Sequence, residues 1–407
     1  MTAETRRLRV LVIGAGWHMT SEISHYTYQL CTALGERHDV SAVLMRRLVP
    51  KAVYPGAGRV DVAQAAYPGR VPVYDGVDWY WGQSMRGAVA FINRQRPDVV
   101  ILQWWTGAVL HSYLRMASYA ARRGARVIVE WHKTQNVGDT GLPGACQYVG
   151  ALMPWLLAWS AGHVVHSEFD LAVVTSAYPL GMAPVRVIRQ GPYDHLRSSP
   201  GAGGTARPVP DGGPPPDGGP TRLLYPGLVS PFEGVEDLVE AFNGLRREQA
   251  EQFRLAIVGK TSRGWAAPAE AIARSPHADL IERVDRYLTD ADLSAWLARA
   301  DAVVLPYHRS PASGPLPIAM SVGLPVVVTA VGGLAEATCD YPGAMLVPPR
   351  DPAALRRALL MLPRLRGRRY AAPHSWGSSV EAFTSLIDEI RGGRPVRAKS
   401  SAVASAR

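Results

Sequence analysis

The chain has 407 residues, of which 47% are hydrophobic and 19% are charged, and it carries a net charge of +10. This length and composition exclude a disordered chain and leave room for two domains with separate cores. The three cysteines are far apart, which excludes a zinc-ligand spacing and a disulfide framework and favours a reducing cytoplasm. We expect no signal peptide in residues 1–16, and no apolar segment reaches the ~18 residues of a membrane-spanning helix.

Short apolar and β-branched runs in the first half of the chain predict strands separated by segments of helix length. The expected strands lie near Leu8–Ile13, Asp39–Leu44, Val99–Leu102, Arg126–Glu130, His163–His166 and Val185–Arg189. This alternation is typical of an α/β domain with a parallel sheet and helices on both faces, and we place the domain at residues 1–197. Residues 198–220 are almost all Gly, Pro, Ser and Asp, cannot build a core, and predict a linker.

Residues 221–374 repeat the pattern and predict a second α/β domain. Its expected strands are Thr221–Tyr225, Phe253–Val258, Ala302–Pro306, Pro325–Thr329 and Ala344–Val347. Ligands bind at the carboxyl ends of parallel strands, so two such edges facing each other across the linker would form a cleft. Residues 375–392 follow as an amphipathic helix with apolar side chains at helical spacing, and the basic tail 393–407 is predicted to be disordered.

One segment of the second domain, residues 301–337, predicts a phosphate site. A buried strand is followed by a loop with Ser313 and Gly314, a helix over Leu316–Val322, a second buried strand and a Gly-Gly turn. The free amides and the dipole at the start of that helix both favour negative charge. We therefore expect a nucleoside diphosphate to bind at this loop, with glycine allowing close backbone approach and serine offering a hydroxyl.

The motifs LPY, SG, AMSVGLPVV and VGGLAE, in this order, resemble the donor site of retaining glycosyltransferases of family 4. GAG near the start, SEISHYTYQLCTAL, GLVSPFEGVEDLVEAF and RLAIVGK extend the resemblance over roughly residues 8–390. It implies the GT-B fold: two facing Rossmann-like domains with parallel sheets and a C-terminal helix that crosses back to the first. It also implies transfer of a sugar from a nucleotide sugar to an unknown acceptor, without metal or cofactor.

Several residues are candidates for holding the donor. The resemblance places the loop at Gly16 against the donor phosphates, whereas a tight strand–helix turn is the alternative explanation. A third glycine is missing because Met19 occupies its position, which disfavours a NAD site. The remaining candidates are Ser313, Gly314, Leu316 and Glu336, with Lys260 or Arg263 supplying positive charge. For Glu336, a surface carboxylate without a role is the alternative.

His132 is the candidate catalytic residue. It follows an apolar strand at the carboxyl end of the sheet, and the resembled family carries a histidine near the transferred sugar at that point. A histidine held by the backbone is the alternative. We expect Glu130 and Lys133 either to orient His132 or to contact the acceptor, and Trp105 to form an acceptor wall while its neighbour packs in the core. His111 and His166 are weaker candidates.

The chain also departs from the family pattern. Ser310 and Ile318 stand where two glutamates are common, which resembles an SG-motif branch, and Leu228 and Glu233 replace the Arg and Lys that hold the diphosphate. A carboxylate beside a diphosphate repels it. These substitutions keep open a non-catalytic GT-B protein that binds a nucleotide sugar or a partner enzyme.

The positive charge suggests a further partner. Six arginines cluster in one stretch: Arg356, Arg357, Arg364, Arg366, Arg368 and Arg369. They form either a solvated helix face or a peripheral contact with an anionic membrane, which would place the protein at the inner face of the membrane. No nucleic-acid-binding module accompanies the charge.

Overall fold

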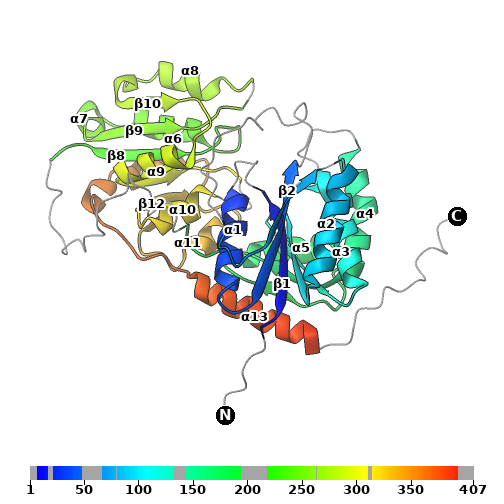
Figure 1. Ribbon diagram of the computed structural model, residues 1–407. Coiled ribbons are helices and arrows are strands. Elements are labelled where there is room, and N and C mark those ends of the chain that lie inside the picture. Colours follow the sequence, from blue (N-terminus) through cyan, green and yellow to red (C-terminus); the bar gives the residue numbers. More distant parts are fainter. Residues whose placement is uncertain are drawn as a thin grey trace, which may run out of the picture. The chain divides into compact units, whose positions relative to one another are not determined.

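The computed structural model describes residues 7–16, 22–47, 67–78, 80–132, 144–193, 218–262, 264–309 and 314–392. The chain divides into two compact units (Figure 1). Unit 1 contains the described residues up to 189 together with 376–392, and unit 2 contains those from 190 to 375. Residues 190–193 belong to unit 2 because Tyr193 is buried in its core and donates its backbone N–H to Ser321 Oγ at 2.8 Å. Within the described residues no helix is long and apolar enough to span a lipid bilayer.

Unit 1 contains a seven-stranded parallel sheet in the order β3-β2-β1-β4-β5-β6-β7. The strands are β1 Arg9–Ala15, β2 Asp39–Arg47, β3 Val73–Asp78, β4 Val99–Trp104, β5 Arg126–Trp131, β6 Ser160–Val165 and β7 Val185–Val187. Its helices are α1 Glu22–Leu34, α2 Gly82–Gln95, α3 Leu110–Ala121, α4 Ala145–Trp159, α5 Glu168–Ala177 and α13 Trp376–Gly392, with a 3-10 turn at Gly107–Val109.

Helices cover both faces of this sheet, as the apolar strands require. Leu11 and Ile13 of β1 point to one face and pack with α2, α3, α4 and α5. Val10 and Val12 point to the other face and pack with α1 and α13. The helix that crosses back is therefore confirmed: α13 lies in unit 1, where Phe383 and Ile387 are buried (Figure 1).

Unit 2 contains a six-stranded parallel sheet in the order β10-β9-β8-β11-β12-β13. The strands are β8 Thr221–Pro226, β9 Phe253–Val258, β10 Ile281–Val284, β11 Ala302–Leu305, β12 Val326–Thr329 and β13 Ala344–Val347. Its helices are α6 Val235–Asn243, α7 Arg247–Ala250, α8 Ala267–Ala273, α9 Asp290–Arg299, α10 Pro315–Ser321, α11 Leu334–Thr338 and α12 Pro352–Leu359, with 3-10 turns at Ala278–Leu280 and Leu362–Leu365.

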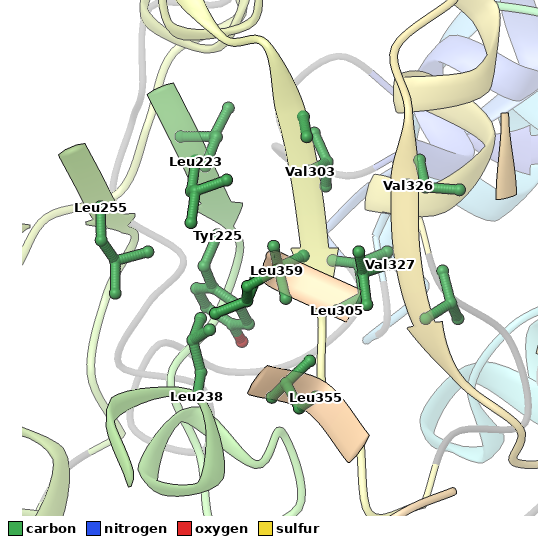
Figure 2. Packing of buried hydrophobic residues seen from close by; sticks show 14 of the residues in the cluster. Leu223, Tyr225, Leu238, Leu255, Val303, Leu305, Val326, Val327, Leu355 and Leu359 are labelled. Atoms are coloured by element: carbon green, nitrogen blue, oxygen red, sulfur yellow. The ribbon is translucent and has the colours of Figure 1, made fainter. Parts of the chain in front are cut away.

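The core of unit 2 lies between the sheet and its helices. Figure 2 shows Leu238 of α6 and Leu355 and Leu359 of α12 packed beside strand residues such as Tyr225 and Leu305. The two parallel sheets confirm the expected α/β class. β3 and β10 were not predicted from the sequence, and β6 begins at Ser160, three residues before the expected start.

Candidate functional site

The carboxyl ends of three neighbouring strands in unit 1 bring four polar side chains together. Gln103 lies at the end of β4, Glu130 and His132 at the end of β5, and His166 directly after β6. Parallel strands end at the same edge of a sheet, which is why residues far apart in sequence meet here. Tyr26 of α1 joins them from the helix that follows β1.

Glu130 is the buried centre of this cluster, with 0% of its surface exposed. Tyr26 donates its hydroxyl to Glu130 Oε1 at 2.5 Å, and Gln103 donates its amide to Oε2 at 3.1 Å. Burial alone would raise the pKa of Glu130, but the interactions with His132 and His166 and the hydrogen bond from Tyr26 outweigh it and lower the pKa. Glu130 is therefore a carboxylate held in place by its neighbours.

The hydrogen bonds of His166 determine how His132 is protonated. His166 Nδ1 lies 2.9 Å from the carbonyl oxygen of Ile188, so this nitrogen carries a proton and donates. Burial and the nearby His132 lower the pKa of His166 to about 4, so His166 is neutral and its Nε2 accepts. His132 Nδ1, at 3.2 Å from that nitrogen, must then be the donor.

His132 consequently turns its other nitrogen toward Glu130. Its Nε2 lies 3.4 Å from Glu130 Oε2, and only 3% of the His132 side chain is exposed. This contact places the Glu130 carboxylate beside the second ring nitrogen of His132. The ring is also fixed by an edge contact with Tyr26, at 4.6 Å between ring centroids.

The same three side chains could hold a metal ion, because ligand atoms of Glu130, His132 and His166 lie within 4.8 Å of one another. The residues do not fit a metal centre well. The hydrogen bond between the imidazoles uses the Nε2 lone pair that His166 would give to the ion. The hydrogen bonds among these groups account for the arrangement, and we derive no step through a metal.

The structure places the remaining candidate residues of unit 1 in different surroundings. Glu130 is fully buried and cannot contact an acceptor, so of its two expected roles only the orientation of His132 is left. Trp105 is half-buried and packs against the hydrophobic core on the face of the sheet that α2, α3, α4 and α5 cover, whereas Trp104 lies within that core. Gly16 donates its N–H to the Met45 carbonyl at 3.0 Å, and a Cβ there would lie 3.0 Å from the same oxygen, so a side chain would crowd this turn. Lys133 lies outside the described residues.

At the same end of unit 1, two aromatic residues that were missed from the sequence, Trp81 and Tyr148, contact the weaker candidate His111. Trp81 has φ 64°, an unusual conformation for a residue with a Cβ, and donates its indole N–H to Ser112 Oγ at 2.8 Å. Its ring lies 5.4 Å from that of His111 between centroids, and His111 Nδ1 is 2.6 Å from the Tyr148 hydroxyl. Strain of this kind concentrates at functional sites, so the group is a candidate acceptor wall beside Trp105.

In unit 2, the candidate donor site lies at the carboxyl ends of β8 and β9. Gly227 and Gly259 have positive φ angles, and a Cβ on Gly259 would overlap the carbonyl of Gly227, so the two turns pack backbone against backbone. Lys260 follows and forms an ion pair with Asp285 at 3.2 Å, while 43% of its side chain remains exposed. Arg283 also pairs with Asp285, at 2.7 Å, which leaves an excess positive charge at this end. Arg263 lies outside the described residues.

The phosphate loop is described only from Gly314 onward, because Ser313 lies outside the described residues. Gly314 immediately precedes α10. The side chain of Leu316 is fully buried in the core and therefore cannot contact a donor. Glu336 is half-buried in the first turn of α11.

Sequence reasoning also missed a pair that fixes the neighbouring loop. His308, after β11, lies 2.8 Å from Asp237 of α6 and donates its backbone N–H to the Phe232 carbonyl at 2.8 Å. The loop that carries Glu233 is thereby tied to β11. This histidine directly follows the motif LPY, but its partner is 71 residues away in sequence. Ile318 is buried in the core, which explains an apolar residue at that position.

The two units and their sheets together define the fold class of the protein. Two Rossmann-like units with parallel sheets and a helix returning to unit 1 constitute the GT-B fold. HepE from Anabaena, solved in complex with UDP, shares it with a TM-score of 0.58 at 13% identity, over 95% of this chain and 97% of that one.

Residues 220–364 match the family described as glycosyl transferases group 1, and they form a domain of that family. Glycogen synthase from Mycobacterium tuberculosis is 30% identical over 273 residues, which cover 65% of this chain and 59% of that protein. D-inositol 3-phosphate glycosyltransferase from Jonesia denitrificans is 29% identical over 184 residues, which cover 42% and 43%. The chain thus covers less than two thirds of the length of these relatives.

Proposed function

We propose that the protein is a retaining glycosyltransferase of family 4 that moves a sugar from a nucleoside-diphosphate sugar to an acceptor. The observation that supports it is the group 1 domain at residues 220–364, whose sheet edge carries Lys260, Gly314 and Glu336. The comparison protein solved with UDP makes a uridine nucleotide the first donor to test.

In the proposed reaction, unit 2 binds the donor and unit 1 binds the acceptor. Negative charge develops on the leaving diphosphate, and the ammonium of Lys260 can stabilise it, while Gly314 allows the diphosphate to approach the backbone. His132, held by Glu130 and His166, supplies positive charge or a hydrogen bond near the transferred sugar. The proposal requires no metal or cofactor. The protein would act in the cytoplasm, with a peripheral contact at the inner face of the membrane.

A second candidate function is a non-catalytic GT-B protein that binds a nucleotide sugar or a partner enzyme. Glu233 favours it, because a carboxylate at the position of a diphosphate-binding lysine weakens donor binding. Leu228, which is 46% exposed, likewise offers no charge in place of arginine. Nucleotide binding without turnover would select this function.

The test of the donor site is calorimetric titration with UDP and other nucleoside diphosphates. Wild-type protein should bind one of them, and Gly314→Leu should bind at least about tenfold more weakly, because a side chain blocks backbone approach to the phosphates. Gly392→Leu is the matched control, since a Cβ there meets nothing within 4 Å. Equal affinity of wild type and Gly314→Leu would contradict the site. Absence of binding to every nucleotide would contradict sugar transfer and nucleotide-sugar binding, and would leave the binding of a partner enzyme as the function.

A further inference from the structure

The outward face of α4 in unit 1 carries no charge. Among the 15 residues of this helix there is no Asp, Glu, Lys or Arg. Its exposed positions are Cys146, Gln147, Gly150, Ala151, Pro154, Trp155 and Ala158. A surface helix of a globular protein normally places charged residues on its solvent side, and Trp155 is instead 53% exposed.

The neighbouring helix α3 lines this face with positive charge. The two helices pack against each other, with α3 between α2 and α4 (Figure 1). The exposed residues of α3 and its C-terminal turn include Arg115, Arg122 and Arg123. Arg122 lies over the ring of Trp159 at 5.4 Å, and Arg123 lies over the ring of Tyr119 at 3.8 Å.

The segment that carries these arginines has no acidic residue of its own, and Asp98, which lines a pocket with Arg123, is paired with Arg9 at 2.8 Å. Residues 99–129 contain four arginines and no Asp or Glu. The next acid, Glu130, is fully buried in the histidine cluster. The combined surface is therefore cationic on α3 and uncharged on α4, with aromatic rings where the two helices meet.

A groove at the C-terminal end of α4 extends the apolar area. It has a volume of about 690 Å³, and its walls include Pro154, Leu157 and Ala158 of α4. The opposite wall contains Met182, which is 98% exposed in the loop after α5. The one acid on the lining, Glu389, is paired with Arg186 at 2.6 Å.

We propose that this α3–α4 surface docks on an anionic lipid bilayer. Trp155 and the small apolar residues of α4 enter the interfacial region, and the arginines of α3 contact lipid phosphates. The arginines of α3 complement the negative charge of lipid phosphates, and arginine lies against tryptophan where α3 meets α4. Both features indicate a lipid surface. The inference identifies a docking surface on unit 1 and holds whether or not the protein transfers a sugar.

The arginine cluster predicted from the sequence is a weaker docking surface. Arg366 pairs with Asp301 at 3.4 Å, and Arg356 donates to the Gly244 carbonyl at 3.1 Å, so both are engaged within unit 2. Exposed Met361 is its apolar neighbour. That region therefore serves as the matched control.

The experiment is co-sedimentation of the full chain with vesicles of phosphatidylcholine, with and without phosphatidylglycerol. Wild type should sediment with the anionic vesicles and be released by salt. Arg122→Gln with Arg123→Gln should weaken partitioning about thirtyfold, since each arginine near the lipid is worth about fivefold. Trp155→Ser should weaken it by roughly tenfold. Arg357→Gln with Arg364→Gln, and Met361→Ser, are the controls and should leave partitioning within about twofold of wild type.

Thermal unfolding of each variant confirms that it is folded before vesicles are added. Loss of partitioning in the α3–α4 variants alone supports the proposal. It is overturned if wild type stays in the supernatant with anionic vesicles, which is also the outcome for a surface that binds an acidic protein. Equal losses in the control variants would overturn it too, because binding would then follow overall charge.

Discussion

His132 has both ring nitrogens directed at neighbours in the protein, His166 at 3.2 Å and Glu130 at 3.4 Å. A histidine held in this way has a fixed ring orientation, because its Nδ1 proton is donated to His166 and its Nε2 faces a carboxylate. The partners that fix it are positioning residues.

We expect His132→Ala to reduce turnover by about 100-fold or more while nucleotide affinity changes little, because the proposed nucleotide site lies in unit 2. Hydrolysis of the donor measures turnover without a known acceptor, and calorimetry measures affinity. His25→Ala, on α1 in the same unit, is the control. Equal hydrolysis by wild type and His132→Ala would make the histidine structural.

His166 predicts a pH dependence of stability. Its pKa is lowered to about 4 by burial, from an unfolded value near 6.5, so the unfolded chain binds a proton that the folded one does not between these pH values. Stability therefore falls as pH drops from 6.5 to 4, by roughly 3 kcal/mol for this residue. His166→Gln should reduce that fall, since an amide can donate to Ile188 and accept from His132 without titrating.

Urea unfolding at a series of pH values checks this expectation. His163, whose pKa burial also lowers to about 4, adds a fall of the same sign, so wild type should lose stability at both histidines. His163→Gln is the matched variant. An unchanged slope in His166→Gln would show that folding does not lower the pKa of His166.

The site was predictable from the sequence only in part. Glu130 and His132 were found because they follow an apolar strand, a signal that lies within a few residues. Tyr26 and Gln103 were not found, because the hydrogen bond from Tyr26 to Glu130 joins residues 104 apart in sequence. No pattern of neighbouring residues in the sequence predicts such a contact, because it forms only when the folded sheet brings α1 and β5 together.

At the scale of the secondary-structure elements, the clearest prediction about packing concerns α13. Phe383 is fully buried against α1 and the sheet, at the middle of the helix. Phe383→Ala should lower the free energy of unfolding of unit 1 by about 3–5 kcal/mol through lost burial and a cavity. Exposed Ser385→Ala on the same helix should change it by less than about 0.5 kcal/mol. Chemical denaturation followed by circular dichroism measures both, and a small effect of Phe383→Ala would mean that α13 is not part of the core.

The two strands that the sequence did not predict share one property. β3 and β10 each lie at an edge of their sheet, and their residues include Asp75, Gly76, Glu282 and Arg283. Central strands are buried on both faces and read as apolar runs, whereas an edge strand is partly exposed and tolerates polar residues. Apolar periodicity therefore identifies the middle of a parallel sheet better than its edges.

For the whole molecule, the order of motifs was enough to predict the GT-B fold, which the two parallel sheets and the shared fold of HepE confirm. The boundary between units was harder to predict. Composition placed it in the Gly- and Pro-rich stretch 198–220, but the chain already joins unit 2 at residue 190, where Tyr193 packs into that core. A change in composition marks where packing stops, whereas the unit boundary depends on which core an apolar side chain joins.

The return of α13 to unit 1 has a consequence for synthesis. A ribosome releases residues 7–189 first, yet one face of their sheet is completed only by Phe383, Ile387 and their neighbours. Unit 2, a continuous stretch over residues 190–375 in the described chain, can therefore close its core before unit 1 does. The part of the protein that is made first finishes folding last, and until then its uncovered strands and α1 are the surface that a chaperone would bind.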